Sequence, residues 1–175
     1  MRTNTTDNPR DNALLSDDRR YRYWLTRAWA PRGPLATFVM LNPSIADAAQ
    51  DDATIRRCTG FARTWGLSGI TVVNLYALIS TNPAGLWRAE DPIGPDNDSH
   101  IEAAATLAGQ HSWPIVAAWG VNARPDRVAA VRRLAGMDRL TALRSTKAGH
   151  PGHPLRLRRD SALVPWPALT AAGNA

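Results

Sequence analysis

Runs of apolar residues alternate along most of the chain with segments whose apolar positions are spaced as in helices. Residues 35–41, 69–78 and 114–120 are apolar over nearly their whole length, as strands buried on both faces of a parallel sheet are. Residues 139–144 predict a fourth, shorter strand. Between these runs, apolar residues three to four positions apart predict helices that begin near residues 53, 97 and 125. The leading segment 21–29 alternates bulky and polar side chains, which predicts one further strand.

A leading strand followed by repeated strand, loop and helix is typical of an α/β fold. We predict a three-layer α/β/α sandwich with a mainly parallel, four-stranded central sheet, plus an extra N-terminal strand. A chain of 175 residues has the size of one domain. We therefore expect a flexible N-terminal tail over 1–17, a single α/β domain over 18–168 and a C-terminal tail over 169–175.

The composition is that of a globular protein, and the chain has no apolar run of the roughly 18 residues that a membrane span needs. The polar first residues do not resemble a secretory signal, and a single cysteine, Cys58, leaves no internal disulfide framework. We expect a cytoplasmic protein with no membrane partner, and a monomer.

The basic side chains are concentrated in the last third of the chain. The formal net charge is +6, and arginine carries nearly all of the positive charge because Lys147 is the only lysine. Between Arg124 and Arg159 there are ten basic residues against two acidic ones. Genomic base composition can explain arginine in place of lysine, whereas the clustering favours a phosphate-bearing partner, either nucleic acid (DNA) or a nucleotide.

Polar residues follow each of the predicted parallel strands. Ligands of open parallel sheets bind beyond the carboxyl ends of the strands, so these residues are candidates for a site. The first strand leads to Asn42 and Ser44, the second contains Asn74, and the third ends at Trp119. The fourth strand leads into a glycine-containing loop with the remaining candidates, Thr146, Lys147, His150 and His153.

Each of the two asparagines has a structural and a functional interpretation. A buried Asn74 must satisfy both a donor and an acceptor, either by holding a neighbouring loop or by reading the edge of a nucleobase. Asn42 precedes Pro43, so it either opens a turn or points into the pocket.

The carboxylates behind the first strand can cap the next helix or activate a water; they are Asp47, Asp51 and Asp52. His150 and His153 each precede a proline. A single cysteine and the lack of further ligands at metal-site spacing argue against a metal.

A phosphate suits the late loop better than a metal does, because hydroxyl, cationic and backbone N–H donors gather there. The backbone amides near Gly149 and Gly152 belong to this expectation, and the expected phosphate-binding side chains are Ser44, Thr146, Lys147 and His150. No dinucleotide, Walker or nucleophile-elbow motif is present, so no cofactor is expected.

Five separated stretches, in order, resemble a single family. They lie within residues 20–166 and read MLNPSIADAAQDDATIRRCTGFARTWG, VVNLYAL, EDPIGPDND, AAWG and TKAGHPGHPL. They are similar to an uncharacterised bacterial family, domain of unknown function 1643. That family has no established activity, so the resemblance implies a family and no function.

The chain also resembles, more weakly, the uracil-DNA glycosylase superfamily. Leu41-Asn42-Pro43 resembles its first loop, although Met40 replaces the glycine that begins that motif, and Asn74 stands at the base-reading position. Ala118-Trp119-Gly120 resembles its third strand. His153-Pro154-Leu155 resembles its late loop, with His150-Pro151-Gly152 as the alternative register. The resemblance implies a uracil-DNA glycosylase-like fold, with Asn42 positioning a water and Asn74, Trp119 and His153 around a base.

Two functions follow from these patterns, beside a third interpretation in which the asparagines and histidines are structural. In the first, the protein hydrolyses an N-glycosidic bond, and the catalytic candidates are Asn42, His153, Asp47 and Asp52. An amide cannot deprotonate a water, so this function needs one of the carboxylates or strong stabilisation of the leaving base. In the second, the pocket binds a nucleotide or nucleic acid without catalysis.

Overall fold

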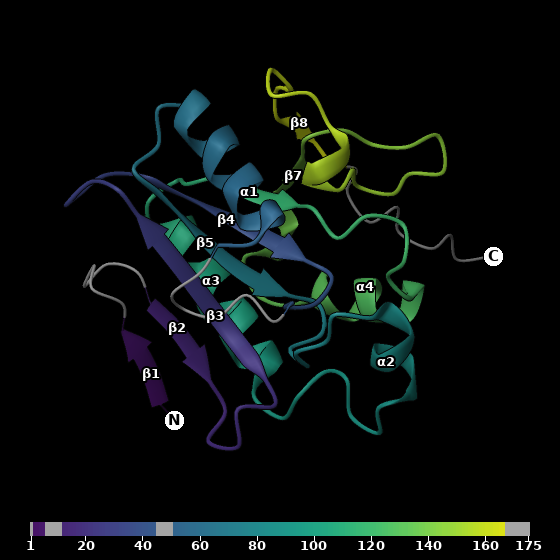
Figure 1. Ribbon diagram of the computed structural model, residues 1–175. Helices are drawn as coiled ribbons and strands as arrows, with labels where there is room; N and C mark the ends of the chain where they lie inside the picture. The colour runs from purple at the N-terminus through teal and green to yellow at the C-terminus, as the bar shows by residue number, and fades with distance from the viewer. Residues whose placement is uncertain (1, 6–11, 45–50, 167–175) are drawn as a thin grey trace.

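The computed structural model describes residues 2–5, 12–44 and 51–166, and these form an α/β structure (Figure 1). The helices are α1 (Ala53–Thr64), α2 (Pro83–Arg88), α3 (Asn97–Gln110) and α4 (Pro125–Val131), with short 3-10 helices at Met137–Arg139 and Pro154–Arg156. The strands are β1 (Arg2–Thr5), β2 (Asn12–Leu15), β3 (Arg22–Ala28), β4 (Leu35–Met40), β5 (Gly69–Asn74), β6 (Ile115–Ala117), β7 (Leu140–Ala142) and β8 (Val164–Pro165). No helix in these ranges is long and apolar enough to cross a membrane.

The sheet has eight strands in the order β1-β2-β3-β5-β4-β6-β7-β8. Its centre, β5-β4-β6-β7, is parallel, and these are the four strands that the apolar runs predict. The remaining strands β1, β2, β3 and β8 pair antiparallel at the two sides. The sheet is therefore wider and more mixed than the predicted four-stranded sheet with one extra strand. The three strands beyond that prediction are at most four residues long, too short to leave an apolar pattern in the sequence.

Two of these strands fall in residues 1–17, the segment for which the sequence predicts a tail. β2 pairs with β3 over residues 12–15, and its Ala13 and Leu15 are buried. A segment with only two buried apolar side chains has no period of its own to detect. Its structure comes from pairing with β3.

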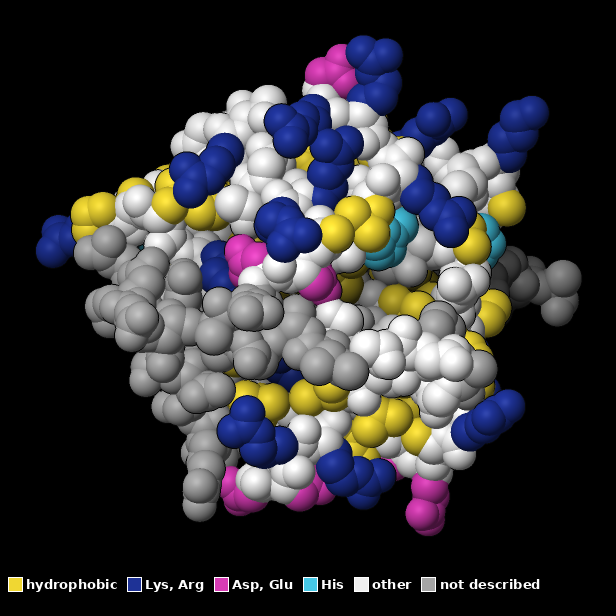
Figure 2. All heavy atoms as spheres, viewed as in Figure 1, with side chains coloured by type: hydrophobic (Ala, Val, Ile, Leu, Met, Phe, Trp, Pro, Cys, Tyr) yellow, Lys and Arg dark blue, Asp and Glu magenta, His cyan; other side chains and the backbone are white. Residues whose placement is uncertain are grey.

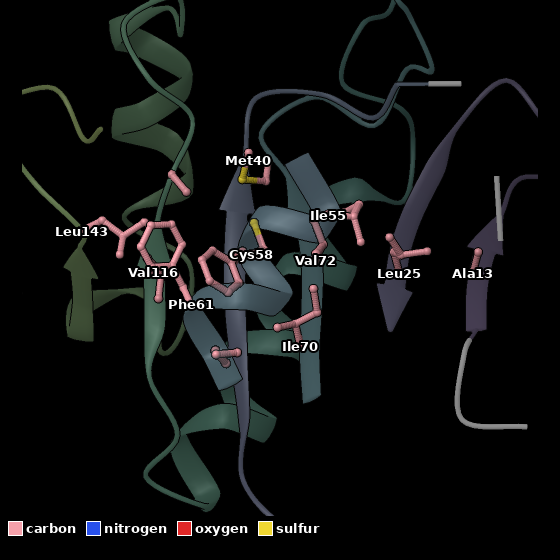
Figure 3. Close-up of a cluster of buried hydrophobic side chains, with 14 of the residues drawn as sticks. Ala13, Leu25, Met40, Ile55, Cys58, Phe61, Ile70, Val72, Val116 and Leu143 are labelled. Carbon is pink, nitrogen blue, oxygen red and sulfur yellow. The ribbon is translucent and has the colours of Figure 1, made fainter. Parts of the chain in front are cut away.

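Helices cover both faces of the parallel strands, which gives the three layers that the sequence predicts (Figure 1). On one face, Ile55, Cys58 and Phe61 of α1 pack over Val72 of β5 and Val116 of β6 (Figure 3). We call this side the α1 face. On the other face, buried residues of α3 and α4 pack with the strand residues of opposite alternation. The four parallel strands are therefore buried on both faces, which explains their continuous apolar runs.

The chain order places a switch point at the centre of the sheet. From β4 the chain passes to β5 on one side, and then to β6 and β7 on the other side of β4. Loops that leave β4 and β6 therefore diverge, and in doubly wound sheets this divergence opens the ligand crevice. The crevice is expected at the carboxyl ends of β4 and β6.

Candidate functional site

A pocket of about 640 Å³ opens at the carboxyl ends of the parallel strands. Met40 of β4, Asn74 of β5, Trp119 after β6 and Arg144 after β7 all line it. The pocket lies at the switch point, and its volume is in the range of about 300–1,000 Å³ that small-molecule sites occupy. The site residues proposed from the sequence that line this pocket are Asn42, Ser44, Asp52, Asn74, Trp119, Thr146, Lys147 and His153.

The lining has a buried and an exposed part. We call the buried lining residues of β3, β4 and β5 the pocket floor: Arg22, Met40, Val72 and Asn74, all at most 5% exposed. We call the exposed lining residues the pocket mouth: Val121, Asn122, Arg144, Thr146, Lys147, Leu155 and Arg156. Asp52, Ser44, Asn42 and His153 are partly buried between the two.

Asn74 ends β5 on the pocket floor, and its side chain lies on the α1 face because it shares the alternation of Val72. Its Nδ2 is buried and has no hydrogen-bond acceptor among the described residues. Its backbone carbonyl accepts from Asn97 Nδ2 at 3.0 Å, so α3 fixes the strand end without using the side-chain amide of Asn74. A buried donor left without an acceptor costs about 1–3 kcal/mol, which a ligand acceptor would recover.

Asn42 has a structural role that fixes the direction of its amide. Its Nδ2 donates to the carbonyls of Pro43 at 3.0 Å and Ser80 at 2.8 Å. Because both partners are acceptors, the nitrogen must face them, and Oδ1 is left for other contacts. Asn42 therefore holds its own turn against the Ser80 segment and can still offer an acceptor to a water in the pocket.

Asp52 joins the two interpretations of the carboxylates, because it caps α1 and also lines the pocket. Its Oδ1 accepts from the backbone N–H of Ile55 at 2.7 Å, and its Oδ2 accepts from the hydroxyl of Ser44. A carboxylate has further lone pairs beside these two bonds, so Asp52 can also accept from a water.

Of the other two candidate carboxylates, Asp51 is described and does not line the pocket. Asp51 is paired with Arg27, with 2.8 Å between Oδ1 and Nε. Asp47 lies outside the described residues. Of the three carboxylates that the sequence leaves open, Asp52 is the one that the described structure brings to the pocket.

His153 lines the pocket and His150 does not, which decides between the two histidines for the pocket position. The backbone N–H of Leu155 donates to His153 Nδ1 at 3.3 Å, so the neutral ring carries its proton on Nε2. Burial lowers the pKa of His153, as does Arg156, while Asp52 opposes them. The ring is thereby kept neutral at physiological pH, with an Nε2–H group as donor.

The late loop is closed by its own hydrogen bonds. Thr146 Oγ1 accepts from the backbone N–H of His150 at 3.0 Å, and the carbonyl of Thr146 accepts from Gly149 at 3.0 Å. The N–H of Gly152 donates to the carbonyl of Arg144 at 2.7 Å. The amides of Gly149 and Gly152 already have acceptors within the loop, so a phosphate bound there would depend on the hydroxyl and cationic side chains rather than on these two amides. The cationic side chains of the mouth remain available.

Trp119 lines the pocket but is only 2% exposed. Its ring packs in the core on the α3 side and meets Trp166 edge-on, with 5.2 Å between ring centroids. Almost none of its surface is available to stack on a base. The apolar lining side chains that are only partly buried, and so offer a flat ring more surface, are Leu41 and Leu157.

Arg22 is a floor residue that the sequence reasoning missed. It is 4% exposed, and burial lowers its pKa to about 10, which leaves it charged at neutral pH. A strand arginine beside two tyrosines gives no signal of this position in the sequence. With Arg144, Lys147 and Arg156 it makes the pocket strongly cationic, since Asp52 is the one acidic residue in the described lining.

Within the described ranges, no group of three or more His, Cys, Asp or Glu side chains is arranged to hold a metal ion. The polar side chains of the described lining are amides, hydroxyls, one carboxylate, one neutral imidazole and several cations.

Comparison with known proteins adds a family to this geometry. No curated protein and no solved structure matches the chain, so the uracil-DNA glycosylase resemblance gains no support from either comparison. The family described as "Protein of unknown function (DUF1643)" matches residues 22–155, which span β3 through the His153 loop and hold nearly the whole pocket. Since this match covers most of the 175 residues, the chain belongs to the DUF1643 family.

Proposed function

We propose that the protein hydrolyses an N-glycosidic bond and so releases a nucleobase from DNA or from a nucleotide. The observation that carries this proposal is that a carboxylate (Asp52), a neutral imidazole (His153) and a buried amide without an acceptor (Asn74) line one pocket. Hydrolysis of this bond needs a group to activate water, a donor to the leaving base and a means of holding the base.

The base would enter the pocket with its edge against Asn74, whose Nδ2 donates to an acceptor on the ring. As the bond from the sugar to the base nitrogen breaks, the electron pair goes to the base. The Nε2–H of His153 stabilises the negative charge that develops there. A neutral imidazole can take this role, because its Nε2–H is a hydrogen-bond donor without a positive charge on the ring.

The water would add to the sugar carbon, and Asp52 would take its proton. Asn42 Oδ1 would orient this water but cannot deprotonate it, because an amide oxygen is not a base near neutral pH. The hydroxyl of Ser44, which donates to Asp52, orients the carboxylate. The proton from the water returns to the released base, so the reaction consumes one water and needs no cofactor.

The phosphates of the substrate would lie at the mouth, where Arg144, Lys147 and Arg156 are exposed. Figure 2, which has the same view as Figure 1, shows lysine and arginine side chains gathered over α1 and the C-terminal segment. Two large apolar side chains, Val121 at 53% and Leu155 at 49%, are exposed at the same mouth. These cations would contact the phosphates of an unstacked nucleic acid strand, and the apolar side chains beside them would contact its bases.

A cleavage assay tests this function. Single- and double-stranded DNA with uracil, hypoxanthine or other altered bases is incubated with the protein, and alkali reveals abasic sites. We expect release by the wild type and a loss of about 100-fold or more in His153→Ala and Asp52→Asn. His150→Ala is the matched control, because His150 also precedes a proline in the same loop and does not line the pocket. An equal effect of both histidine variants would contradict the role of His153.

A second candidate is a binding module without catalysis, and the contacts of Asp52 favour it. Both oxygens of this carboxylate already accept hydrogen bonds, and one of them caps a helix. A proton taken up by either oxygen would compete with the helix cap or with the Ser44 contact, which favours a structural role for Asp52. DNA or nucleotide that is retained, with a steep dependence on salt and no base release, would support binding without catalysis.

A further inference from the structure

A β-bulge turns Arg22 into the pocket. In the β2–β3 ladder, Leu14 pairs with Trp24 and Leu15 pairs with Arg22, so Tyr23 is the extra residue. In a regular ladder Leu15 would pair with Tyr23, on the face of Leu25. Arg22 takes that place on the α1 face, and Tyr23 instead stacks on His100 of α3, with 4.9 Å between ring centroids. Bulges next to functional sites commonly re-aim a side chain in this way.

Arg22 and Asn74 are the two hydrogen-bonding side chains of the pocket floor. Arginine is a pure donor, and a guanidinium has enough N–H groups to serve a protein partner and a ligand acceptor together. Asn74 adds its buried Nδ2, which has no acceptor among the described residues. Both donors come from adjacent strands of the sheet, β3 and β5. A ligand that reaches the deepest part of the pocket must therefore present hydrogen-bond acceptors to these donors.

The position of these donors argues for a ring edge rather than a phosphate. Arg22 is 4% exposed and Asn74 is 2% exposed, so a bound group must lose nearly all of its water. A phosphate loses hydration at a high cost, and exposed cations are available to it at the mouth. The keto oxygen of a flat ring is neutral, and an arginine fork commonly reads such an oxygen on guanine.

We propose that Arg22 and Asn74 select a base with a keto oxygen, such as hypoxanthine, guanine or uracil, over one with an amino group at that position. The selection rests on the proposed nucleobase pocket. An amino-substituted base would turn a donor toward two protein donors, whereas a keto oxygen accepts from both. Arg22 is then a specificity-determining residue that contacts the ligand.

The test measures binding, so it does not depend on catalysis. Titration calorimetry compares inosine monophosphate with adenosine monophosphate, and uridine monophosphate with cytidine monophosphate. The members of each pair differ in whether the ring carries a keto or an amino group. We expect the keto member to bind about tenfold or more tightly to the wild type. The two pairs also show whether the pocket takes a purine or a pyrimidine.

Variants of Arg22 then assign the selectivity. Arg22→Met keeps the length of the side chain without its donors and should reduce the keto preference to about threefold or less, and Arg22→Lys should keep part of it. The matched control is Arg27→Met, which replaces another buried arginine of β3 that does not line the pocket. Circular dichroism confirms the fold of each variant. The control should keep the wild-type preference.

The outcomes separate the two proposals. Failure of all four nucleotides to bind overturns the proposed nucleobase pocket, and the selectivity falls with it. Binding of keto and amino members with equal affinity leaves the pocket standing and overturns the role of Arg22 and Asn74. A wild-type preference that survives in Arg22→Met also overturns the role of Arg22. If Arg22→Met does not fold, the wild-type affinities and Arg22→Lys still decide.

Discussion

The side-chain amide of Asn97 donates to the backbone carbonyl of Asn74, with 3.0 Å between Nδ2 and the oxygen. The same nitrogen lies 3.1 Å from the carbonyl of Leu75. Asn97 begins α3 and is fully buried, so it ties this helix to the end of β5 beneath the pocket. Asn97 belongs to the stretch EDPIGPDND. One structural role of this stretch is therefore to anchor the end of β5, which carries the side-chain amide of Asn74 on the pocket floor.

Replacement of Asn97 by alanine should destabilise the protein. The substitution removes the amide donor from two buried carbonyls, although Leu75 keeps its bond from Arg127 Nε at 2.7 Å. We expect a loss of about 1–3 kcal/mol in the free energy of unfolding, measured with urea. Ser99→Ala on the same helix is the control and should change stability by about 0.5 kcal/mol or less, since Ser99 is exposed. Equal losses in the two variants would contradict the anchoring role.

Two substitutions of Asp52 separate its role as the N-cap of α1 from its proposed role as the carboxylate that activates water. Asparagine is as good an N-cap as aspartate, so Asp52→Asn should keep the stability of α1 while it removes the carboxylate from the pocket. Asp52→Ala removes both and should cost about 0.5–2 kcal/mol in unfolding free energy. Urea unfolding and base release are measured on both variants. A stable Asp52→Asn with wild-type release would show that the carboxylate has no catalytic role.

Stability should fall in mild acid because two histidines resist protonation in the folded protein. Burial lowers the pKa of His100 from its ordinary 6.5, and it lowers that of His153 as well. The unfolded chain therefore takes up protons at a higher pH than the folded protein does. The stability that these two groups contribute is present above pH 6.5 and is lost as the pH falls toward their lowered values.

His100→Phe tests that pH dependence, because phenylalanine can keep the stack on Tyr23 and cannot be protonated. We expect a smaller fall in stability than in the wild type when unfolding is followed between about pH 5 and pH 8. His111→Phe, at the C-cap of α3, gives the comparison. A wild-type pH dependence in His100→Phe would contradict the assignment to His100.

The thiol of Cys58 should be unreactive in the folded protein. Cys58 lies fully buried on the inward side of α1, and burial raises the pKa of its thiol, so almost no thiolate exists at neutral pH. A thiol reagent should react with it only after unfolding, at a rate that follows the unfolding of the chain. Rapid labelling under native conditions would contradict the packing of α1 against β4 and β5.

The cations of the pocket mouth should control binding to polyanions. Arg144→Gln and Arg156→Gln should each weaken binding of single-stranded DNA, and each should reduce the slope of log affinity against log salt by about 0.7–1. Arg139→Gln is the charge-matched control. Arg139 is exposed just before β7 begins, at the amino ends of the parallel strands and so on the opposite side of the sheet from the pocket. An equal change of slope in the control would place the DNA away from the pocket.

Much of the fold followed from local patterns. The runs at 35–41, 69–78 and 114–120 are apolar because parallel strands are buried on both faces, and a short window of sequence records this burial. The order of these strands, with helices between them, places Asn42, Asn74 and the His153 loop at the carboxyl ends of the parallel strands. The sequence by itself therefore determined the three layers and the region of the pocket.

Tertiary structure decided what the pocket contains. Whether Asp51 or Asp52 faces it depends on Arg27, a partner 24 positions away along the chain, and whether Gly149 and Gly152 can hold a phosphate depends on how the loop closes on itself. The entry of Arg22 depends on a bulge in the pairing of β3 with β2, a strand too short to show a period. Periodicity reports the burial of a residue against its own neighbours. Partners, registers and bulges arise from contacts between distant segments, and no local pattern records them.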